Sequence, residues 1–501
     1  MPPLHRQSLL LSLLLFALAP NPGTSFVMQQ LLRPPINQLN KVRLMATSIS
    51  APEHHIHPPQ QPYISLSSIV EGTQRTIAKT ATSLFHLDVT EEELDSSLVC
   101  VKGLTTPVLV RAPSIGSFSL VKSFTNESLQ SFIGTVNKVV SDPSNRILTG
   151  RAVSVFCGLE GSQVRVIPGH FDPDKGYSFV DVIEAKERLP SPSKVNESDY
   201  LNYIDKYIQN LIPEPCAPTL RQIENFEPLF RVSVVLLPDN YACIFIGMSH
   251  VLGDIVTYTA LMDQLSSLHD AHKSRPIKWN NPEQSTHSIS SESLSQRDKD
   301  IMYGLPFVVG VSKNLWTIPH REHEYLSLSR DKINAKRKEL CAEGGTPLSS
   351  NDIIMAALCD ANRSSDIFAY TTRSTKELHS KECQGGNLYV EVPFPRDVGS
   401  DPNRFRALFK KGHYYEQDGL PIKPFIFGRV GRITSCVAPL SVHMQFGEGS
   451  ETICQAPPHE FVHMTPFDSA VIFTQDGDHI GILHNFAQID KSSDLLQGIL
   501  A

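Results

Sequence analysis

The fold is decided by residues 230–254, which read FRVSVVLLPDNYACIFIGMSHVLGD. Two apolar runs, Phe230–Leu237 and Cys243–Met248, are separated by the turn residues Pro238-Asp239-Asn240. Runs of this length, rich in Val, Ile and Phe and bounded by turn residues, predict two buried strands. Beyond them, apolar residues recur at helical spacing, which predicts a helix over Ile255–Leu268.

His250 stands where the second strand ends and the helix begins. Gly253 permits the tight turn between them, and strand-to-helix corners expose their end residue to a cleft. Because an imidazole has a pKa near neutrality, it can accept a proton and return it. The pattern His250-x-x-x-Asp254 therefore indicates a general base. The alternative is a structural histidine at a strand end, with Asp254 only capping the helix.

The same spacing occurs a second time, at His170 and Asp174. This copy lies in a polar stretch with Pro173 and Gly176 and has no strand-to-helix corner around it. We expect a loop there and assign it no chemistry.

Strands and helices alternate along the rest of the chain without internal repeats. We expect a leader over 1–50, a disordered linker over 51–64, a first lobe over 65–285, a crossover linker over 286–320 and a second lobe over 321–501. The expected strands are Leu98–Val110, Ile147–Phe156 and Asn387–Val392, and the expected helices are Glu127–Val140, Arg330–Leu340 and one capped by Ser349 with Asp352 in its first turn.

Composition narrows the function. A chain of 501 residues is too long for one simple domain, and its 41% apolar and 19% charged residues are typical of a globular protein. The net charge of −7 and the absence of a basic stripe argue against nucleic acid as a partner. Nine cysteines without a Cys-x-x-Cys pair argue against a disulfide framework and against a thiolate zinc site.

The first 50 residues look like a targeting leader. The apolar run Leu9–Ala19 has the length of a signal-peptide core and is too short to span a membrane. Basic residues follow, with no acidic residue before Glu53. This layout resembles the bipartite presequence of algae with secondary plastids, in which a Phe, here Phe26, follows the signal cleavage point. The resemblance implies a plastid; the secretory pathway or the ER is the alternative. We expect no transmembrane segment elsewhere.

Four segments in order resemble the His-x-x-x-Asp acyltransferase superfamily, which includes chloramphenicol acetyltransferase, condensation domains and the plant BAHD acyltransferases. The resemblance covers most of residues 65–501. Its segments are the hairpin Pro228–Met248 before His250, the stretch Leu348–Leu358, the strand Tyr389–Arg396, and Thr434-Ser435-Cys436 followed by Phe446-Gly447-Glu448-Gly449.

The resemblance implies an α/β fold of two chloramphenicol-acetyltransferase-like lobes with a tunnel between them. His250 would take a proton from a hydroxyl or amine acceptor that attacks an acyl-CoA thioester. Asp254 would be structural and pair with Arg396, and Thr434 or Ser435 would donate to the oxyanion. Acyl-CoA would be a co-substrate, with no permanent cofactor and no metal. We expect a monomer, and a pigment or lipid alcohol as acceptor if the plastid prediction holds.

Departures from the family pattern keep two rivals open. Ile255 replaces the usual Gly, and Ser249 replaces the second His that often precedes the catalytic one. In the late motif around Phe446-Gly447-Glu448-Gly449, Gln445 and Glu448 replace the family's Asp and Trp. These departures predict a divergent member with a different acceptor pocket, or a non-catalytic binding protein that retains the fold.

A zinc hydrolase is the other rival. His459-Glu460-Phe461-Val462-His463 spells His-Glu-x-x-His, which on a helix puts two ligands on one face. The prolines on both sides leave barely two turns for this helix, and no Glu follows to serve as a third ligand. We therefore favour acyl transfer.

Overall fold

The computed structural model describes residues 96–102, 114–156, 162–169, 179–212, 222–223, 227–266, 276–279, 295–303, 306–307, 309–310, 313–314, 322–342, 347–373, 383–386, 389–411, 419–436, 444–463 and 467–501. All belong to the compact unit Ala81–Ala501. The expected leader, the linker over 51–64 and the copy at His170 and Asp174 lie outside the described residues. Among the helices described, none is both long and apolar enough to cross a membrane.

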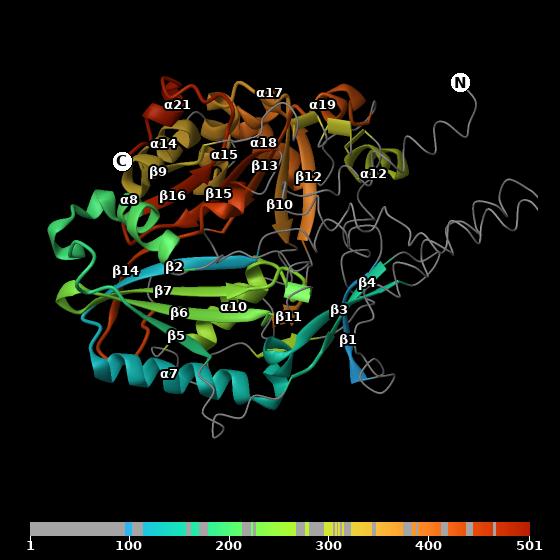
Figure 1. Cartoon of the computed structure of the whole chain (residues 1–501). Helices are drawn as coiled ribbons and strands as arrows, with labels where there is room; N and C mark the ends of the chain where they lie inside the picture. The colour runs from blue at the N-terminus through green and yellow to red at the C-terminus, as the bar shows by residue number, and fades with distance from the viewer. Residues whose placement is uncertain are drawn as a thin grey trace, which may run out of the picture. The chain divides into compact units, whose positions relative to one another are not determined.

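The first sheet contains the predicted hairpin at its centre. Its five strands run in the order β14-β2-β7-β6-β5 (Figure 1). The neighbours are antiparallel except β5 and β6, which are parallel. The bounds are β2 (Ile115–Lys122), β5 (Val180–Glu184), β6 (Phe230–Leu237), β7 (Tyr241–Met248) and β14 (Glu451–Ala456).

The hairpin turn forms because its residues tolerate positive φ. Asp239 and Asn240 both have φ 57°, a left-handed conformation that Asp and Asn adopt more readily than other residues with a side chain. Leu237 then pairs with Tyr241 and Phe230 with Met248, so the register brings the two apolar runs side by side.

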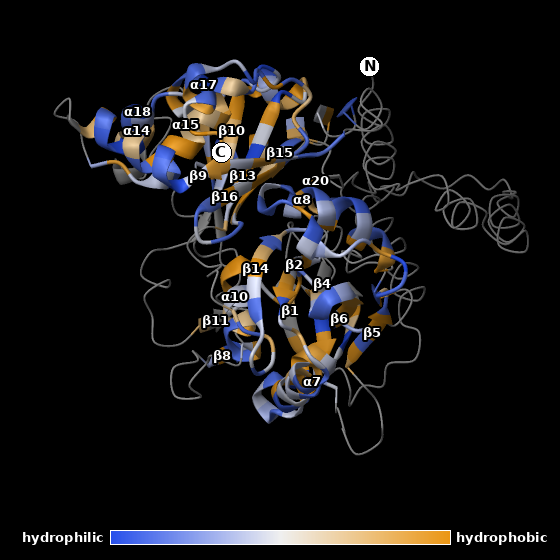
Figure 2. Ribbon diagram, turned by 90° about the vertical axis from the view of Figure 1, so that its left-hand side faces the viewer, coloured by the Kyte–Doolittle hydropathy of each residue, from blue (hydrophilic) through white to orange (hydrophobic). Residues whose placement is uncertain are grey.

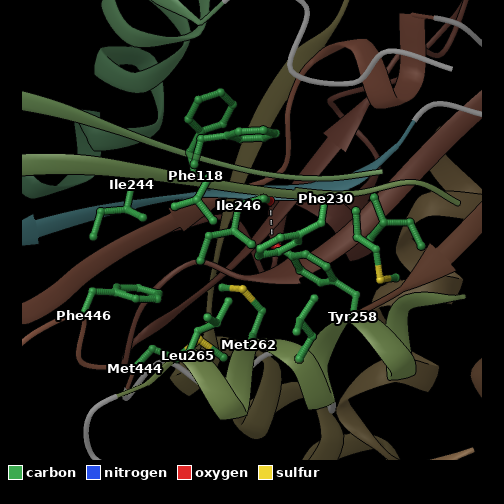
Figure 3. Packing of buried hydrophobic residues seen from close by; sticks show 14 of the residues in the cluster. Phe118, Phe230, Ile244, Ile246, Tyr258, Met262, Leu265, Met444 and Phe446 are labelled. Carbon is green, nitrogen blue, oxygen red and sulfur yellow. Dashed lines mark hydrogen bonds between the residues drawn. The ribbon is translucent and has the colours of Figure 1, made fainter. Parts of the chain in front are cut away.

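Two helices are associated with this sheet, α7 (Asn126–Ser141) and α10 (Ile255–Leu265), both close to their predicted bounds. In Figure 3, Tyr258 and Met262 of α10 point toward the strands, and Ile244 and Ile246 point back at the helix. The Tyr258 hydroxyl donates to the Ile246 carbonyl at 2.9 Å. All four side chains are fully buried, so α10 is held against β7.

One predicted strand begins later than expected. Residues Pro143–Thr149 form a 3₁₀ helix, and β3 (Arg151–Phe156) starts only after Gly150. Asp142 causes this, because its side chain accepts from the backbone N–H of Ser144 and Pro143 occupies the first helical position. The expected strand start at Ile147 is therefore wrong.

The second sheet has six strands in the order β12-β10-β13-β15-β16-β9. Helices cover one of its faces (Figure 1). Its elements are β9 (Glu324–Ser329), β10 (Ile367–Arg373), β12 (Tyr389–Pro395), β13 (Val430–Ser435), β15 (Asp468–Thr474) and β16 (His479–His484), with α14 (Arg330–Ala342), α15 (Ser350–Ala361), α17 (Arg396–Gly399), α18 (Pro402–Lys411) and α21 (Asp494–Gln497).

The predicted cap of α15 is confirmed. The Ser349 hydroxyl accepts from the Asp352 backbone N–H at 3.2 Å, and the Asp352 carboxylate accepts from the Ser349 backbone N–H at 2.6 Å. Figure 2 shows α14 largely hydrophilic, whereas α15 carries many hydrophobic residues. Helix α15 is therefore the one buried against the sheet, and α14 lies nearer the solvent.

Both faces of the second sheet are buried, as β15 shows. Ala470 and Ile472 belong to the core beneath the helices, whereas Val471 and Phe473 belong to the core of the first sheet. Because side chains of a strand alternate between faces, the second sheet turns its helix-free face toward the first.

The two halves of the sequence are also interlocked. Strand β14 comes from the second half but pairs with β2 of the first, from Glu451 opposite Lys122 to Ala456 opposite Phe118. Strand β8 (Ile277–Trp279) also joins the two halves, because it pairs in parallel with β11 (Cys383–Gly385).

The remaining elements are β1 (Leu98–Lys102), β4 (Ser162–Ile167), α8 (Tyr200–Tyr203), α12 (Gln296–Tyr303), α19 (Ile422–Ile426), α20 (Glu460–His463), a π-helix over Ile204–Ile208 and 3₁₀ turns over Pro192–Lys194, Glu197–Asp199, Gln209–Leu211 and Pro238–Asn240.

Candidate active site

His250 lies in the turn between β7 and α10, as the sequence predicts, and is half-buried. The backbone N–H of Ser249 donates to the Leu229 carbonyl at 2.7 Å, and that of Leu252 to the Ser249 carbonyl at 3.0 Å. A Cβ on Gly253 would stand 2.6 Å from the Thr257 Cβ, which is closer than two such non-bonded carbon atoms approach each other. The corner therefore needs glycine for close packing against α10.

Asp254 fixes the start of α10. Its buried carboxylate accepts from the backbone N–H groups of Val256 and Thr257 at 3.1 and 3.2 Å. Its own N–H donates to the Gly386 carbonyl at 3.2 Å. This is the capping arrangement for a helix N-terminus, where a negative charge also meets the positive end of the helix dipole.

The expected pairing of Asp254 with Arg396 is wrong. Arg396 begins α17, and its Nη1 donates to the Asn362 carbonyl at 3.2 Å. Gly386, which contacts Asp254, precedes strand β12 in the chain, and Arg396 follows it. The seven extended residues of this strand span roughly 20 Å. The two charged groups therefore stand at opposite ends of β12.

A small cavity of about 20 Å³, partly open to solvent and with room for about one water molecule, lies beside the corner. Two of its lining residues, Ile115 and Ile255, adjoin the corner. Ile115 pairs with Met248, shortly before His250, and Ile255 directly follows Asp254. Both sheets contribute to its wall, and most of the wall is apolar. The lining residues are Ile115, Gly116, Ser117, Ile255, Cys436, Gln455, Ala456, Pro457, Phe461, Val471 and Phe473.

Gln455 places an unpaired amide in this apolar wall. The residue is 1% exposed, and neither Nε2 nor Oε1 has a hydrogen-bond partner in the part of the chain that the structure describes. The hydroxyl of Ser119, its register partner on β2, also lacks one there. A buried polar group without a partner costs about 1–3 kcal/mol, so such a group is usually kept for a ligand or water. No motif in the sequence marks Gln455, and sequence reasoning missed it.

The two expected oxyanion donors separate onto opposite faces of β13. Thr434 is in register with Val471, which lines the cavity, and Cys436 lines it two residues later. Ser435 alternates to the other face, where its side chain lies close to the hydroxyl of Tyr370. Of the pair, Thr434 stands on the cavity face.

Burial around the cavity is strong enough to suppress thiolate chemistry. Burial raises the pKa of the Cys436 thiol to about 12, and the nearby charge of Asp254 acts in the same direction. Because a thiol nucleophile must ionise to react, Cys436 is an apolar wall residue and not a nucleophile at neutral pH.

The late motif forms a tight turn packed against the start of α7. Phe446 is fully buried, with its ring edge-on to Phe132 at a centroid distance of 5.4 Å. The Glu448 carbonyl accepts from the Ser128 hydroxyl at 2.7 Å. The contacts of this turn are therefore with the first-sheet core and α7.

The His-Glu-x-x-His segment does not form the helix that a zinc hydrolase requires. Helix α20 spans only Glu460–His463, and His459 precedes it. His459 is directed instead at Asp205, with Nδ1 3.1 Å from Oδ1.

No protein-family model matches the chain, and no curated protein matches its sequence. Solved structures share its fold. TRI101 of F. graminearum in complex with coenzyme A and T-2 mycotoxin is 10% identical, with a TM-score of 0.56 over 81% of this chain and 99% of that one. The same protein with ethyl coenzyme A gives 10% identity and 0.54 over 81% and 98%. TRI101 of F. sporotrichioides with coenzyme A and T-2 gives 12% and 0.50 over 81% and 99%.

At this identity the likeness concerns the fold alone. It confirms the predicted fold class, a mixed α/β chain with two sheet-containing lobes of the chloramphenicol-acetyltransferase type.

Proposed function

We propose that the chain is an acyltransferase that moves an acyl group from an acyl-CoA thioester to a hydroxyl or amine. The observation that carries this proposal is the His250 corner beside a cavity built from both sheets. The fold supports it, because TRI101 holds coenzyme A on the same architecture.

In the proposed reaction, neutral His250 accepts the proton of the acceptor as its oxygen or nitrogen attacks the thioester carbonyl. The resulting tetrahedral oxyanion receives a hydrogen bond from Thr434, which stands on the cavity face of β13. The intermediate then expels the coenzyme A sulfur, which takes up the proton held by His250. Atoms and charges balance without an acyl-enzyme.

The cavity wall indicates the kind of acceptor. Most lining residues are apolar, and Gln455 offers one donor and one acceptor without partners. A wall of this composition favours an acceptor that is apolar beside the corner and carries one further polar group, because apolar pockets with a few placed polar groups bind such ligands. A lipid or pigment alcohol belongs to this class.

A binding protein that has lost catalysis is the second candidate, and one observation favours it. Ile255 replaces the family glycine, and its side chain lines the cavity next to the corner. A bulkier wall there narrows the space for an acceptor.

The test is the release of free coenzyme A thiol from a series of acyl-CoA thioesters, with and without apolar alcohols and amines. We expect thiol release that depends on the acceptor, together with the matching ester or amide in the product analysis. Binding of acyl-CoA with no acceptor-dependent release from any combination would contradict acyl transfer and support the binding protein.

A further inference from the structure

Three side chains that commonly bind metal ions meet where the two halves of the chain join. Asp205 comes from the π-helix Ile204–Ile208, His323 immediately precedes β9, and His459 immediately precedes α20. His323 Nε2 is 3.0 Å from Asp205 Oδ1, and His459 Nδ1 is 3.1 Å from the same oxygen. The ligand atoms of all three lie within 4.8 Å of one another.

From this geometry we propose that Asp205, His323 and His459 bind a divalent transition-metal ion of the zinc class. The ion would tie the π-helix of the first lobe to two segments of the second. This metal site and the proposed acyl transfer do not depend on each other.

The spacing of the ligand atoms fits such an ion. In a tetrahedral zinc site with bonds of about 2.0–2.1 Å, neighbouring ligand atoms stand about 3.3 Å apart. The two Asp205 distances of 3.0 and 3.1 Å are close to this value. Two imidazole nitrogens and a carboxylate oxygen suit zinc and leave one tetrahedral position for water.

A second carboxylate orients one of the ligands. His459 Nε2 is 3.3 Å from Glu460 Oε1, while Nδ1 faces Asp205. A metal-binding histidine usually donates its other ring N–H to a carboxylate, which fixes the tautomer and makes the ligating nitrogen more basic. Glu460 stands where such a partner is needed.

Gln209 holds the segments in place around the cluster. Its Oε1 accepts from the backbone N–H of His459 at 2.8 Å, and its Nε2 donates to Asp205 Oδ1 at 3.0 Å. Nε2 also donates at 3.0 Å to the Tyr325 hydroxyl, which in turn donates to the Pro457 carbonyl at 2.7 Å. The ligand backbones are thus preorganised, as a specific site requires.

The competing explanation is a cluster that binds only protons. Burial alone would raise the pKa of Asp205, but the hydrogen bonds from His323 and His459 outweigh it and hold that pKa well below its usual range. Burial would lower the pKa of His459, but Asp205 and Glu460 raise it above its usual value. Other charged or titratable groups face this junction from β9, β15, β16 and the C-terminal segment: Glu324, Asp468, His484 and Lys491.

The two explanations predict opposite pH dependences. Metal binding requires neutral histidines, so the stabilisation of the folded protein by an added ion should grow as pH rises. Without metal, the raised pKa of His459 stabilises the folded protein through its protonated form. This stabilisation is complete below the pKa that His459 has in the unfolded chain, and it is lost as pH rises through the pKa of His459 in the folded protein.

The experiment uses the full chain, stripped with a chelator, and Zn²⁺ as the probe. We expect one equivalent of zinc in metal analysis after dialysis, and a melting temperature that Zn²⁺ raises more at pH 8 than at pH 6. His323→Gln and His459→Gln should each abolish both effects, and Glu460→Ala should weaken zinc binding about 10–100-fold.

His479→Gln is the matched control. His479 also contacts a carboxylate, with Nδ1 2.9 Å from Asp476 Oδ1, but it belongs to no group of three possible ligands among the described residues. Its loss should leave zinc binding unchanged. Wild-type protein that keeps no zinc, or that is stabilised only by acidification without metal, would overturn the proposal even if a variant failed to fold.

Discussion

At the scale of single residues, the amide of Gln455 can be tested for its role without disturbing the wall around it. Gln455→Met keeps the length of the side chain and removes two buried polar atoms that lack partners. We expect the free energy of unfolding to rise by about 1 kcal/mol or more, because the desolvation penalty disappears. Turnover with a polar acceptor should fall. Urea denaturation and steady-state kinetics measure the two effects.

Gln475 supplies the control for that substitution. It is equally buried, at 1% exposed, but its Oε1 accepts from the Ser327 hydroxyl at 2.9 Å. Gln475→Met should therefore destabilise the protein. If the two substitutions lower stability alike, Gln455 is a structural residue and not a ligand-binding one.

The sequence predicts some site residues and not others for identifiable reasons. His250 and Asp254 lie within one local strand–turn–helix pattern, so their positions follow from nearby residues. The placement of Arg396 depends on how β12 runs across the second sheet, and the family resemblance implied the wrong partner for it. Gln455 reaches the cavity only because β14 pairs with β2, which no local pattern predicts.

At the scale of elements, the late-motif turn contains two glycines that differ in their surroundings. Both have positive φ, 84° for Gly447 and 76° for Gly449. A Cβ on Gly447 would stand 2.0 Å from the Ser128 carbonyl oxygen, whereas one on Gly449 meets nothing within 4 Å. Gly447 therefore lies against α7 and Gly449 does not.

Alanine at each glycine separates packing from backbone strain. Gly449→Ala should cost about 1–2 kcal/mol from the left-handed conformation alone. Gly447→Ala should cost clearly more, because the turn must also move away from α7. Chemical denaturation gives both values, and equal losses would show that this turn does not depend on its contact with Ser128.

The elements that the sequence predicts are those whose apolar spacing and cap residues lie within a short stretch of the chain. The hairpin β6–β7, helix α10 and the capped helix α15 follow from apolar spacing and cap residues. Strand β2, IGSFSLVK, has no comparable signal, because serines occupy positions that become buried. Ser117 is accommodated by a 2.8 Å hydrogen bond with the Tyr258 hydroxyl, a contact made only in the folded chain.

At the scale of the whole described unit, the cavity is a product of both halves of the chain. Residues 115–117 and Ile255 come from the first half, and residues 436, 455–457, 461, 471 and 473 from the second. The order of the family-like segments predicts two lobes, and the fold confirms them. Strand β14 comes from the second half and joins the first sheet through a long-range pairing with β2, which sequence spacing could not predict.

The central claim is that His250 is the base of an acyl transfer, and the turnover of His250→Ala tests it most directly. General-base catalysis typically contributes about 10²–10⁴-fold, so the turnover number should fall by that factor. Because His250 lies half-buried in a turn, the melting temperature should change little. His170→Ala, which removes the histidine of the second His-x-x-x-Asp copy, should leave turnover unchanged. Unchanged turnover in His250→Ala, or equal losses in both variants, would contradict the account.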